Sequence, residues 1–332
     1  MRRLVRALAL AAGGLLAVVV LVLGLGALAT LVIAQVVEAR YPHGGRFVEV
    51  AGGRLAVVEA GPPSGGRGTV VLLHGASSNS ADMMLGLGRR LAADGFRVVA
   101  LDRPGQGWSD RVGGDEAASP AAQGRAVAQA LGRLGIERAI VVGHSWSGAL
   151  ALNLALDQPD RVGGLLLLAP VTHPWPGGAI SPVYETLSVR WLGRLLAWTL
   201  TAPAGALLFD GAVASVFAPQ AAPPGYAAAA ALPLILRPAS FYANAEDVAG
   251  LNAFVTRQSP RHGAIRVPTV IVAGDVDPVV QTPRHAERLA AEVAGARLVV
   301  LPGVGHMLHQ TEADTIVAEA RALAARLGDH PD

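Results

Sequence analysis

The chain has 332 residues, of which 52% are hydrophobic and 16% charged, and its formal net charge at pH 7 is +2. It contains no cysteine, which excludes disulfides, thiolate metal sites and a cysteine nucleophile and leaves the redox compartment undetermined. Apart from histidine, every basic residue is arginine, and no basic patch with interleaved aromatic residues occurs, so the sequence gives no support to nucleic-acid binding.

The N-terminal segment differs in character from the rest of the chain. Arg2, Arg3 and Arg6 precede an uncharged stretch over residues 7–37. This stretch is longer than the ~20 residues that a helix needs to cross a bilayer, and tilting would absorb the excess. The alternative is a core helix with one face in water, but no polar face is present along the segment. We therefore expect residues 1–40 to form one transmembrane helix that anchors the protein.

A cleaved signal peptide is the alternative for this segment, because residues 27–29 (Ala-Leu-Ala) could imitate a cleavage site. Signal peptides, however, carry apolar stretches of about 7–15 residues, and cleavage there would leave an apolar new terminus. We favour an uncleaved anchor. The arginines before the segment, compared with Glu38 and Arg40 after it, predict a cytoplasmic N-terminus. The rest of the chain would then lie on the periplasmic, or more generally the extracytoplasmic, side.

Strand and helix signals alternate after the anchor. A hairpin is expected first, from residues 47–50 and 55–58 around Gly52-Gly53. Apolar β-branched runs and helical runs then follow one another. The expected order is strand 68–73, helix 81–93, strand 96–101, helix 121–134, strand 139–142, helix 149–156 and strand 165–168. This alternation predicts an α/β fold with a mostly parallel, doubly wound sheet.

The alternation stops between residue 171 and about residue 260. Prolines and apolar helical runs, such as 191–200 and 226–236, dominate this segment. Strands resume at 267–273 and 296–301, a helix at 312–327 closes the chain, and no internal repeat is evident. The sequence therefore predicts one core made of residues 45–170 and 261–328, interrupted by a mainly helical insertion over residues 171–260.

The most informative motif is Gly143-His144-Ser145-Trp146-Ser147-Gly148, between an expected strand and an expected helix. A serine between small residues at such a turn is typical of a nucleophile elbow, where the bend presents the hydroxyl above the sheet. Ser147 occupies a position that is usually glycine, which is a mild departure. The alternative interpretation is a buried strand that ends in an ordinary Gly/Ser turn.

Residues that could activate this serine follow in the required order. A nucleophilic serine needs a base, and the base needs a carboxylate that orients it. In folds with this elbow the chain order is serine, then acid, then histidine. The strand 267–273 runs into Asp275 and Asp277, and the strand 296–301 runs toward His306. Each candidate thus lies just beyond a strand's carboxyl end, where open parallel sheets bind ligands.

Two further motifs occur upstream. A His74-Gly75-Ala76 turn follows one strand, and a D-x-x-G-x-G-x-S loop over residues 102–109 follows the next. With the elbow, the G-x-x-D acid turn and the final Gly-His pair, they resemble the alpha/beta-hydrolase superfamily, in particular its serine-nucleophile, esterase-like members. The resemblance covers about residues 47–327. It implies the alpha/beta-hydrolase fold, with the insertion forming a helical cap over the active site.

The resemblance also implies roles for individual residues. Ser145 would be the nucleophile, Asp277 the orienting acid and His306 the base. The backbone N–H groups of Ala76 and Trp146 would form the oxyanion hole. Asp275 is a rival acid and His309 a rival base, but the family's spacing favours Asp277 and His306. No metal and no organic cofactor is implied.

Other polar residues have structural interpretations. We expect His74 to brace its turn and His144 to pack beside the elbow. Asp102 is expected to accept N–H bonds within its loop. Three further histidines are expected to be surface or cap residues and not catalysts: His173, His262 and His285.

The insertion is strongly apolar and carries scattered aromatic residues, some of which should face the cleft and bind an acyl chain or an aromatic ring. The sequence therefore predicts a serine hydrolase that cleaves a small apolar carboxylic ester through an acyl-enzyme. Alternatives on the same residues are C–C bond hydrolysis of a diketone-like acid and cofactor-free perhydrolysis. A non-catalytic binding module is the alternative of another class. Dehalogenases and epoxide hydrolases are disfavoured, because those relatives carry aspartate in place of Ser145. The oligomeric state stays open.

Overall fold

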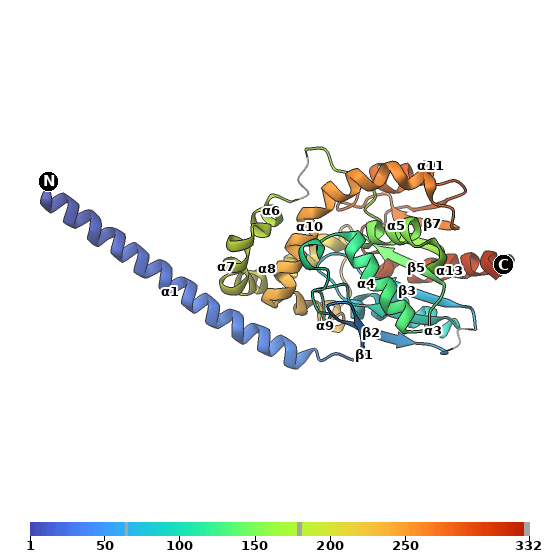
Figure 1. The fold of residues 1–332 in the computed structure, drawn as a ribbon, viewed down its shortest axis with the longest axis horizontal. Helices are drawn as coiled ribbons and strands as arrows, with labels where there is room; N and C mark the ends of the chain where they lie inside the picture. The colour runs from blue at the N-terminus through green and yellow to red at the C-terminus, as the bar shows by residue number, and fades with distance from the viewer. Residues whose placement is uncertain (64–65, 178–180, 329–332) are drawn as a thin grey trace.

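The computed structural model describes residues 1–63, 66–177 and 181–328. Within these residues an eight-stranded sheet runs through the centre, in the order β1-β2-β4-β3-β5-β6-β7-β8 (Figure 1). The strands are β1 (Arg46–Val50), β2 (Gly53–Ala60), β3 (Thr69–Leu73), β4 (Arg97–Leu101), β5 (Ala139–His144), β6 (Val162–Leu168), β7 (Thr269–Gly274) and β8 (Arg297–Leu301). β1 pairs with β2, and β2 with β4, in antiparallel fashion, and every other pairing is parallel. The predicted hairpin and mostly parallel sheet are confirmed.

Helices follow the strands as the alternation predicts. After β3 come α2 (Ser80–Met83), the π-helical η1 (Met84–Gly88) and α3 (Arg89–Ala93), and after β4 come the short η2 (Gly114–Glu116) and α4 (Pro120–Arg133). After β5 come α5 (Ser147–Asp157) and η3 (Pro159–Arg161). After β7 come η6 (Pro283–Glu287) and α11 (Arg288–Glu292), and after β8 come α12 (Leu308–Thr311) and α13 (Ala313–Gly328). The sequence does not predict the helical run over residues 283–292 or the short helices η2, η3 and α12.

Alternate residues of the central strands enter two separate apolar cores. Val71, Val141 and Leu167 pack on one face of the sheet, whereas Leu72 and Val142 pack on the other. β5 and β6 are buried along their whole length, as expected for central parallel strands covered on both faces. The carboxyl ends of these strands are therefore rigid supports for the loops that follow them.

Residues 171–260, which we call the cap segment, consist mainly of helices joined by loops. Residues 178–180 lie outside the described residues. The segment contains α6 (Pro182–Ser188), α7 (Arg190–Thr199), α8 (Thr201–Phe217), α9 (Tyr226–Ala229), η4 (Leu232–Leu236) and α10 (Pro238–Gln258), and η5 (Ser259–Ala264) returns to the core. The prediction of a single helical run over residues 226–236 is wrong. Ala231 adopts a left-handed conformation, with φ of 50°, which breaks the run between α9 and η4.

Helix α1 (Arg2–Arg40) projects from the body of the protein (Figure 1). It is long and apolar enough to cross a membrane, with a mean hydropathy of 2.9 in its most apolar window. These properties fit a membrane anchor and also a signal sequence. The second half of α1 contacts α7, α8 and η4 of the cap segment.

Candidate active site

Ser145 lies in a sharp turn between β5 and α5. Its φ is 53°, a left-handed conformation that costs a non-glycine residue free energy. Glycine is required on both sides of this turn. A Cβ on Gly143 would lie 2.5 Å from the carbonyl oxygen of Ser147, and a Cβ on Gly148 would lie 2.5 Å from Cβ of Pro170. The bend therefore depends on these small residues, as a nucleophile elbow requires.

The serine at position 147 has its own function in this turn. Its side chain is fully buried, and its hydroxyl donates a hydrogen bond to the carbonyl of His74. A glycine at this position could not form that bond. The departure from the usual glycine therefore joins the elbow to the turn that follows β3.

Asp277, His306 and Ser145 form a hydrogen-bonded chain, although they come from three different loops. Nδ1 of His306 donates to Oδ2 of Asp277 over 2.8 Å, and the Ser145 hydroxyl donates to Nε2 of His306 over 2.9 Å. The other oxygen of Asp277 accepts the backbone N–H groups of Val279 and Val280. Ser145, Asp277 and His306 are only 4–9% exposed to solvent. This arrangement fixes the tautomer of His306 and leaves Nε2 free to accept the serine proton.

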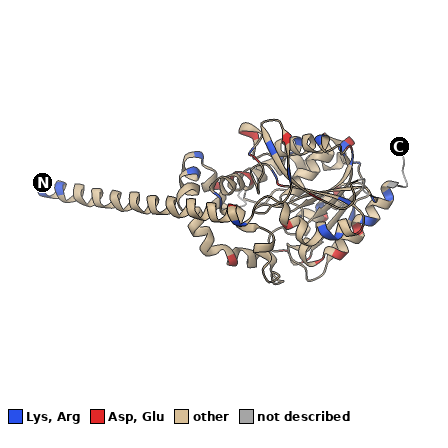
Figure 2. Ribbon diagram, turned by 90° about the horizontal axis from the view of Figure 1, so that it is seen from below, with Lys and Arg blue, Asp and Glu red and all other residues tan. Residues whose placement is uncertain are grey.

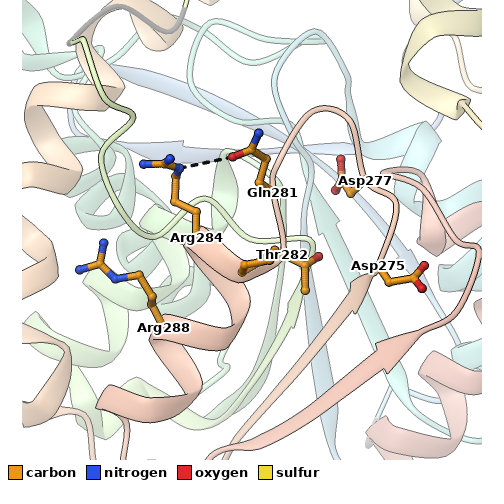
Figure 3. A pocket seen from close by; sticks show the side chains of 7 residues that line it. Asp275, Asp277, Gln281, Thr282, Arg284 and Arg288 are labelled. Atoms are coloured by element: carbon orange, nitrogen blue, oxygen red, sulfur yellow. Dashed lines mark hydrogen bonds between the residues drawn. The ribbon is translucent and has the colours of Figure 1, made fainter.

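Asp275 does not take part in this chain. Its carboxylate accepts the backbone N–H of Gly303 over 2.6 Å. Figure 3 shows Asp275 and Asp277 on the loop after β7, with their carboxylates pointing in different directions. A hollow of about 470 Å³ beside this loop is lined by both aspartates and by Arg284, but not by Ser145. Of the two rival acids, only Asp277 therefore forms a hydrogen bond with His306 in the described structure.

His309 pairs with a different carboxylate. Its Nε2 lies 3.2 Å from both oxygens of Asp82, and Asp82 also accepts the hydroxyl protons of Ser78 and Tyr226. Burial alone would raise the pKa of Asp82, but His309 and these two hydroxyl donors outweigh burial and hold the pKa well below its usual range. Asp82 is therefore a fixed anion, and the ring of His309 is held away from the Ser145 hydroxyl.

The turn after β3 is braced as predicted. Nδ1 of His74 donates to the carbonyl of Gly75 over 2.8 Å, and Nε2 accepts the backbone N–H of Arg103 over 2.9 Å. Within the described residues the backbone N–H groups of Ala76 and Trp146 donate to no other protein atom, and both residues line the cleft above Ser145. Two such N–H groups can stabilise an oxyanion that forms beside the serine.

A fully buried ion pair, which was not predicted from the sequence, supports this turn. Arg103 contacts Asp247 of α10 over 2.8 Å, with neither side chain exposed to solvent. The guanidinium also donates to the carbonyls of His74 and Gly75 and lies 3.9 Å from the ring centre of Trp146. Arg103 therefore joins the turn after β3, the turn at Ser145 and the cap segment. The local signal for Arg103 is its position next to Asp102, in the D-x-x-G-x-G-x-S loop over residues 102–109.

The cleft above Ser145 has a volume of about 550 Å³. Its walls come from the core loops and from the cap segment, and most of the cap residues are apolar. Representative lining residues are Trp175, Phe209, Val216, Ile235, Phe241 and Leu251. Asp82 is the charged residue of this lining, and none of the described lining residues is an arginine. The cleft thus suits an apolar, uncharged group next to the serine.

The predictions for His144 and Asp102 are confirmed. His144 donates from Nε2 to the carbonyl of His306, and its ring packs against His309. Burial and the neighbouring rings of His309 and His306 hold the pKa of His144 well below its usual value, so it stays neutral beside the serine. Asp102 accepts the backbone N–H groups of Ser80 and Trp108.

The prediction that His173, His262 and His285 are surface or cap residues is wrong where it concerns exposure, because all three are buried. Glu292 at the end of α11 accepts hydrogen bonds from both His173 and His262, and Thr172 donates its N–H to His285. These partners replace water at one ring nitrogen of His262 and of His285, whose Nε2 atoms have no hydrogen-bond partner among the described residues. His173, His262 and Glu292 also place three donor atoms within 4.8 Å of one another, the group of described residues that could hold a metal ion. None of them lines the cleft of Ser145.

Comparison with known proteins identifies the family. Residues 68–313 match the model of the alpha/beta hydrolase fold. The chain belongs to this family. It is 31% identical over 257 residues to a 2-hydroxy-6-oxo-6-phenylhexa-2,4-dienoate hydrolase of Burkholderia cepacia, a match that covers 74% of this chain and 83% of that protein. This alpha/beta hydrolase is therefore an enzyme of the hydrolase class, as the sequence predicted.

Solved structures agree on the fold. An enol-lactonase from Burkholderia xenovorans LB400 matches with a TM-score of 0.69 at 22% identity, covering 84% of this chain and 100% of that one. An esterase from Exiguobacterium antarcticum matches with a TM-score of 0.64 at 20% identity, covering 85% of this chain and 99% of that one. At these identities the matches establish the alpha/beta-hydrolase fold and leave the substrate open.

Proposed function

We propose that this hydrolase cleaves a neutral, apolar carboxylic ester through an acyl-enzyme on Ser145. The observation that carries the proposal is the hydrogen-bonded chain from Asp277 through His306 to Ser145, at the floor of an apolar cleft. In this proposal His306 is the general base and Asp277 orients it and stabilises its charged form.

The reaction proceeds in two halves. Oγ of Ser145 attacks the ester carbonyl carbon while its proton passes to Nε2 of His306. The resulting oxyanion accepts hydrogen bonds from the N–H groups of Ala76 and Trp146, each contributing about 3 kcal/mol to transition-state stabilisation. The tetrahedral intermediate collapses, the C–O bond to the alcohol breaks, and His306 protonates the departing oxygen. His306 then takes a proton from water, the water attacks the acyl-enzyme, and the acid leaves as Ser145 is reprotonated.

The second candidate is hydrolysis of a C–C bond in a diketone-like acid, on the same three residues. Its support is the resemblance to the Burkholderia cepacia protein, whose name gives a dienoate as the substrate. A dienoate carries a carboxylate, which needs a cationic partner when it leaves water. The described lining of this cleft offers the anionic Asp82 and no arginine. This charge distribution favours a neutral ester.

The proposal includes membrane attachment through α1. Its apolar length fits a single span, and Arg2, Arg3 and Arg6 at its start favour a cytoplasmic N-terminus. The helix would stay uncleaved and hold the hydrolase body on the extracytoplasmic side.

Activity profiling tests the chemical part of the proposal. Full-length protein in detergent is assayed on p-nitrophenyl esters of graded chain length and on a 2-hydroxy-6-oxo-dienoate, with Ser145→Ala as the control. We expect a higher kcat/KM for the neutral esters, no turnover by Ser145→Ala, and the same thermal unfolding for both proteins. A higher kcat/KM for the dienoate would contradict the ester proposal and favour the C–C hydrolase.

A further inference from the structure

The cap segment exposes a large apolar surface. Outside α1, most of the exposed large apolar side chains lie in the segment from α6 to α8, including Val189 between α6 and α7. Leu207 is 88% exposed, Trp191 71%, Leu208 70% and Trp198 43%. A concentration of exposed apolar side chains on neighbouring helices points to an interaction site.

Helix α8 makes this surface unusual for a protein that faces only water. Asp210 is the single charged residue in its sequence, and most of its residues are exposed, with Ala202 and Phe217 as the buried ones. A helix that is apolar on all sides is normally buried in a protein core or in a membrane. In the described structure neither the core nor another cap helix covers the exposed side of α8.

The corner between α7 and α8 is docked on α1. The Thr30 hydroxyl donates to the carbonyl of Thr199, at the end of α7, over 3.1 Å. A Cβ on Gly26 would lie 2.4 Å from the same carbonyl oxygen, so glycine is needed for this close approach. At Thr199 the chain turns by 74° into α8.

The C-terminal end of α1 is also tied to the hydrolase body. Glu38 pairs with Arg237 of the cap segment at 3.5 Å, and the Trp108 indole donates to the carbonyl of Tyr41 over 3.0 Å. Helix α1 is therefore attached at two levels and has a defined direction relative to the cleft.

The free part of α1 has the length of one membrane crossing. Residues 2–22 are exposed on all sides, whereas one face packs on the cap from about residue 23 onward. At ~1.5 Å per residue the free part is about 30 Å long, the thickness of the hydrocarbon core. Because Arg2, Arg3 and Arg6 stay outside the hydrocarbon, a bilayer of this thickness would extend from about Ala7 to about Gly26, at the level of the α7–α8 corner. Figure 2 shows a long α1 that is tan along most of its length, with basic residues in blue at its free end and few charged residues on the neighbouring cap helices.

The residues of the cap fit this position. Trp191 and Trp198 are of the type that accumulates at membrane interfaces. Arg190 and Arg194 on the same helix are exposed and can reach lipid phosphates. Asp210 is the one exposed acid of α8 and needs to stay on the aqueous side of this boundary.

The apolar surface is continuous with the active-site cleft. Leu208 is exposed at the surface and also lines the cleft, together with Gly205 and Phe209 of the same helix. One side of α8 thus forms a wall of the cleft. Leu208 on this helix also belongs to the exposed apolar surface.

We propose that the exposed face of α7 and α8 lies in the outer surface of the bilayer, and that the cleft takes its substrate, an acyl ester dissolved in the membrane, directly from the lipid phase. This inference rests on the proposed ester hydrolysis and on the proposed anchoring by α1. It adds a substrate class, a membrane-resident ester, and a route of entry beside Leu208.

A depth measurement tests the placement of the cap. Because the chain has no cysteine, Leu207→Cys creates a single labelling site. The full-length variant carries an environment-sensitive fluorophore in nanodiscs of phosphatidylcholine and phosphatidylglycerol. Asp160→Cys, exposed in η3 between α5 and β6, is the matched control. We expect lipid-borne nitroxide to quench the label at residue 207 and aqueous iodide to quench the label at residue 160.

Two results would overturn the placement. Quenching of the label at residue 207 by iodide, to the extent seen at residue 160, would show that the cap faces water. Protection from both quenchers would show that protein, such as a second copy of the chain, covers this face.

An activity ratio tests the route of entry. Leu207→Asp is compared with Val300→Asp, which places the same charge on an exposed apolar position in β8. In nanodiscs we expect Leu207→Asp to lower kcat/KM for a long-chain ester embedded in the bilayer by about tenfold, because a carboxylate opposes insertion. Hydrolysis of a short water-soluble ester should not change, and Val300→Asp should affect neither.

The outcomes of the activity test are distinguishable. Equal effects of Leu207→Asp on the two esters, or no effect on either, would overturn the inference while leaving the proposed function intact. Wild-type protein that hydrolyses neither ester would instead contradict the proposed function. The fluorophore at residue 207 would then decide the membrane placement alone.

Discussion

The core wall of the cleft and its cap wall hold their residues in place by different means. On the core side, Ser145 and Asp277 follow the buried strands β5 and β7, His306 follows the edge strand β8, and directed hydrogen bonds join the three side chains. On the cap side, α8 has one charged residue and a largely exposed apolar surface. Proton transfer needs atoms that are fixed within tenths of an ångström, whereas an apolar substrate needs area with little directionality. In the proposed function, chemistry and substrate choice therefore belong to separate parts of the chain.

The two walls meet at a few buried polar contacts. Arg103 of the core pairs with Asp247 of α10, and Asp82 of the core accepts the hydroxyl of Tyr226 in α9. These contacts fix the cap relative to the elbow. Substitutions in the core wall, at the contacts between the walls and in the cap should therefore have effects of decreasing size.

The largest effect is expected inside the core wall. Asp277→Asn should lower kcat by about 10⁴-fold, because His306 loses the carboxylate that fixes its tautomer and stabilises its charge. Asp275→Asn is the matched control, since that carboxylate accepts a bond from Gly303 outside the site. Steady-state kinetics on a p-nitrophenyl ester measures both variants. A larger loss for Asp275→Asn would mean that the roles of the two aspartates are exchanged.

At the contact between the walls, Asp247→Ala should lower the free energy of unfolding by about 3–5 kcal/mol, because it leaves Arg103 buried and without its anionic partner. Glu246→Ala, at the next position of α10, removes a partly exposed pair with Arg111 and should cost less than about 1 kcal/mol. Urea unfolding followed by tryptophan fluorescence measures the difference. Similar costs for the two variants would argue that the buried pair does not join the walls.

The contact between Asp82 and Tyr226 makes the free energy of unfolding depend on pH. The pKa of Asp82 is held below its usual range in the folded protein, so its carboxylate stabilises the fold above the unfolded pKa of ~3.9 and loses this effect as the pH falls toward the folded pKa. Asp82→Asn should therefore cost about 1–3 kcal/mol at pH 7. The difference from wild type should shrink below about pH 4. A difference that is constant from pH 7 to pH 3 would contradict the anionic state of Asp82.

The smallest effect is expected where the cap meets α1. Thr30→Val removes the hydrogen bond to the Thr199 carbonyl and should lower thermal stability in nanodiscs by about 1 kcal/mol. Thr186→Val, whose hydroxyl bonds within its own helix, should have almost no effect. If the two variants behave alike, the bond between α1 and the cap does not stabilise their docking.

The fold and the members of the hydrogen-bonded chain could be predicted from the sequence, because they depend on local signals. The alternation of strands and helices, the small residues around Ser145 and the positions of Asp277 and His306 after strands are all local. The buried Arg103–Asp247 pair could not be predicted, since its members are 144 positions apart. The burial of His173 and His262 likewise depends on Glu292, a distant residue. Helix boundaries at Ala231 depend on packing and not on propensity.

The central claim is that Ser145 is the nucleophile of this hydrolase. Labelling of the full-length protein with a fluorophosphonate, followed by peptide mass spectrometry, tests it most directly. The account predicts a single adduct on Ser145, which disappears in Ser145→Ala while that variant unfolds at the wild-type temperature. An adduct on Ser147 or Ser109, or labelling that persists in Ser145→Ala, would contradict it.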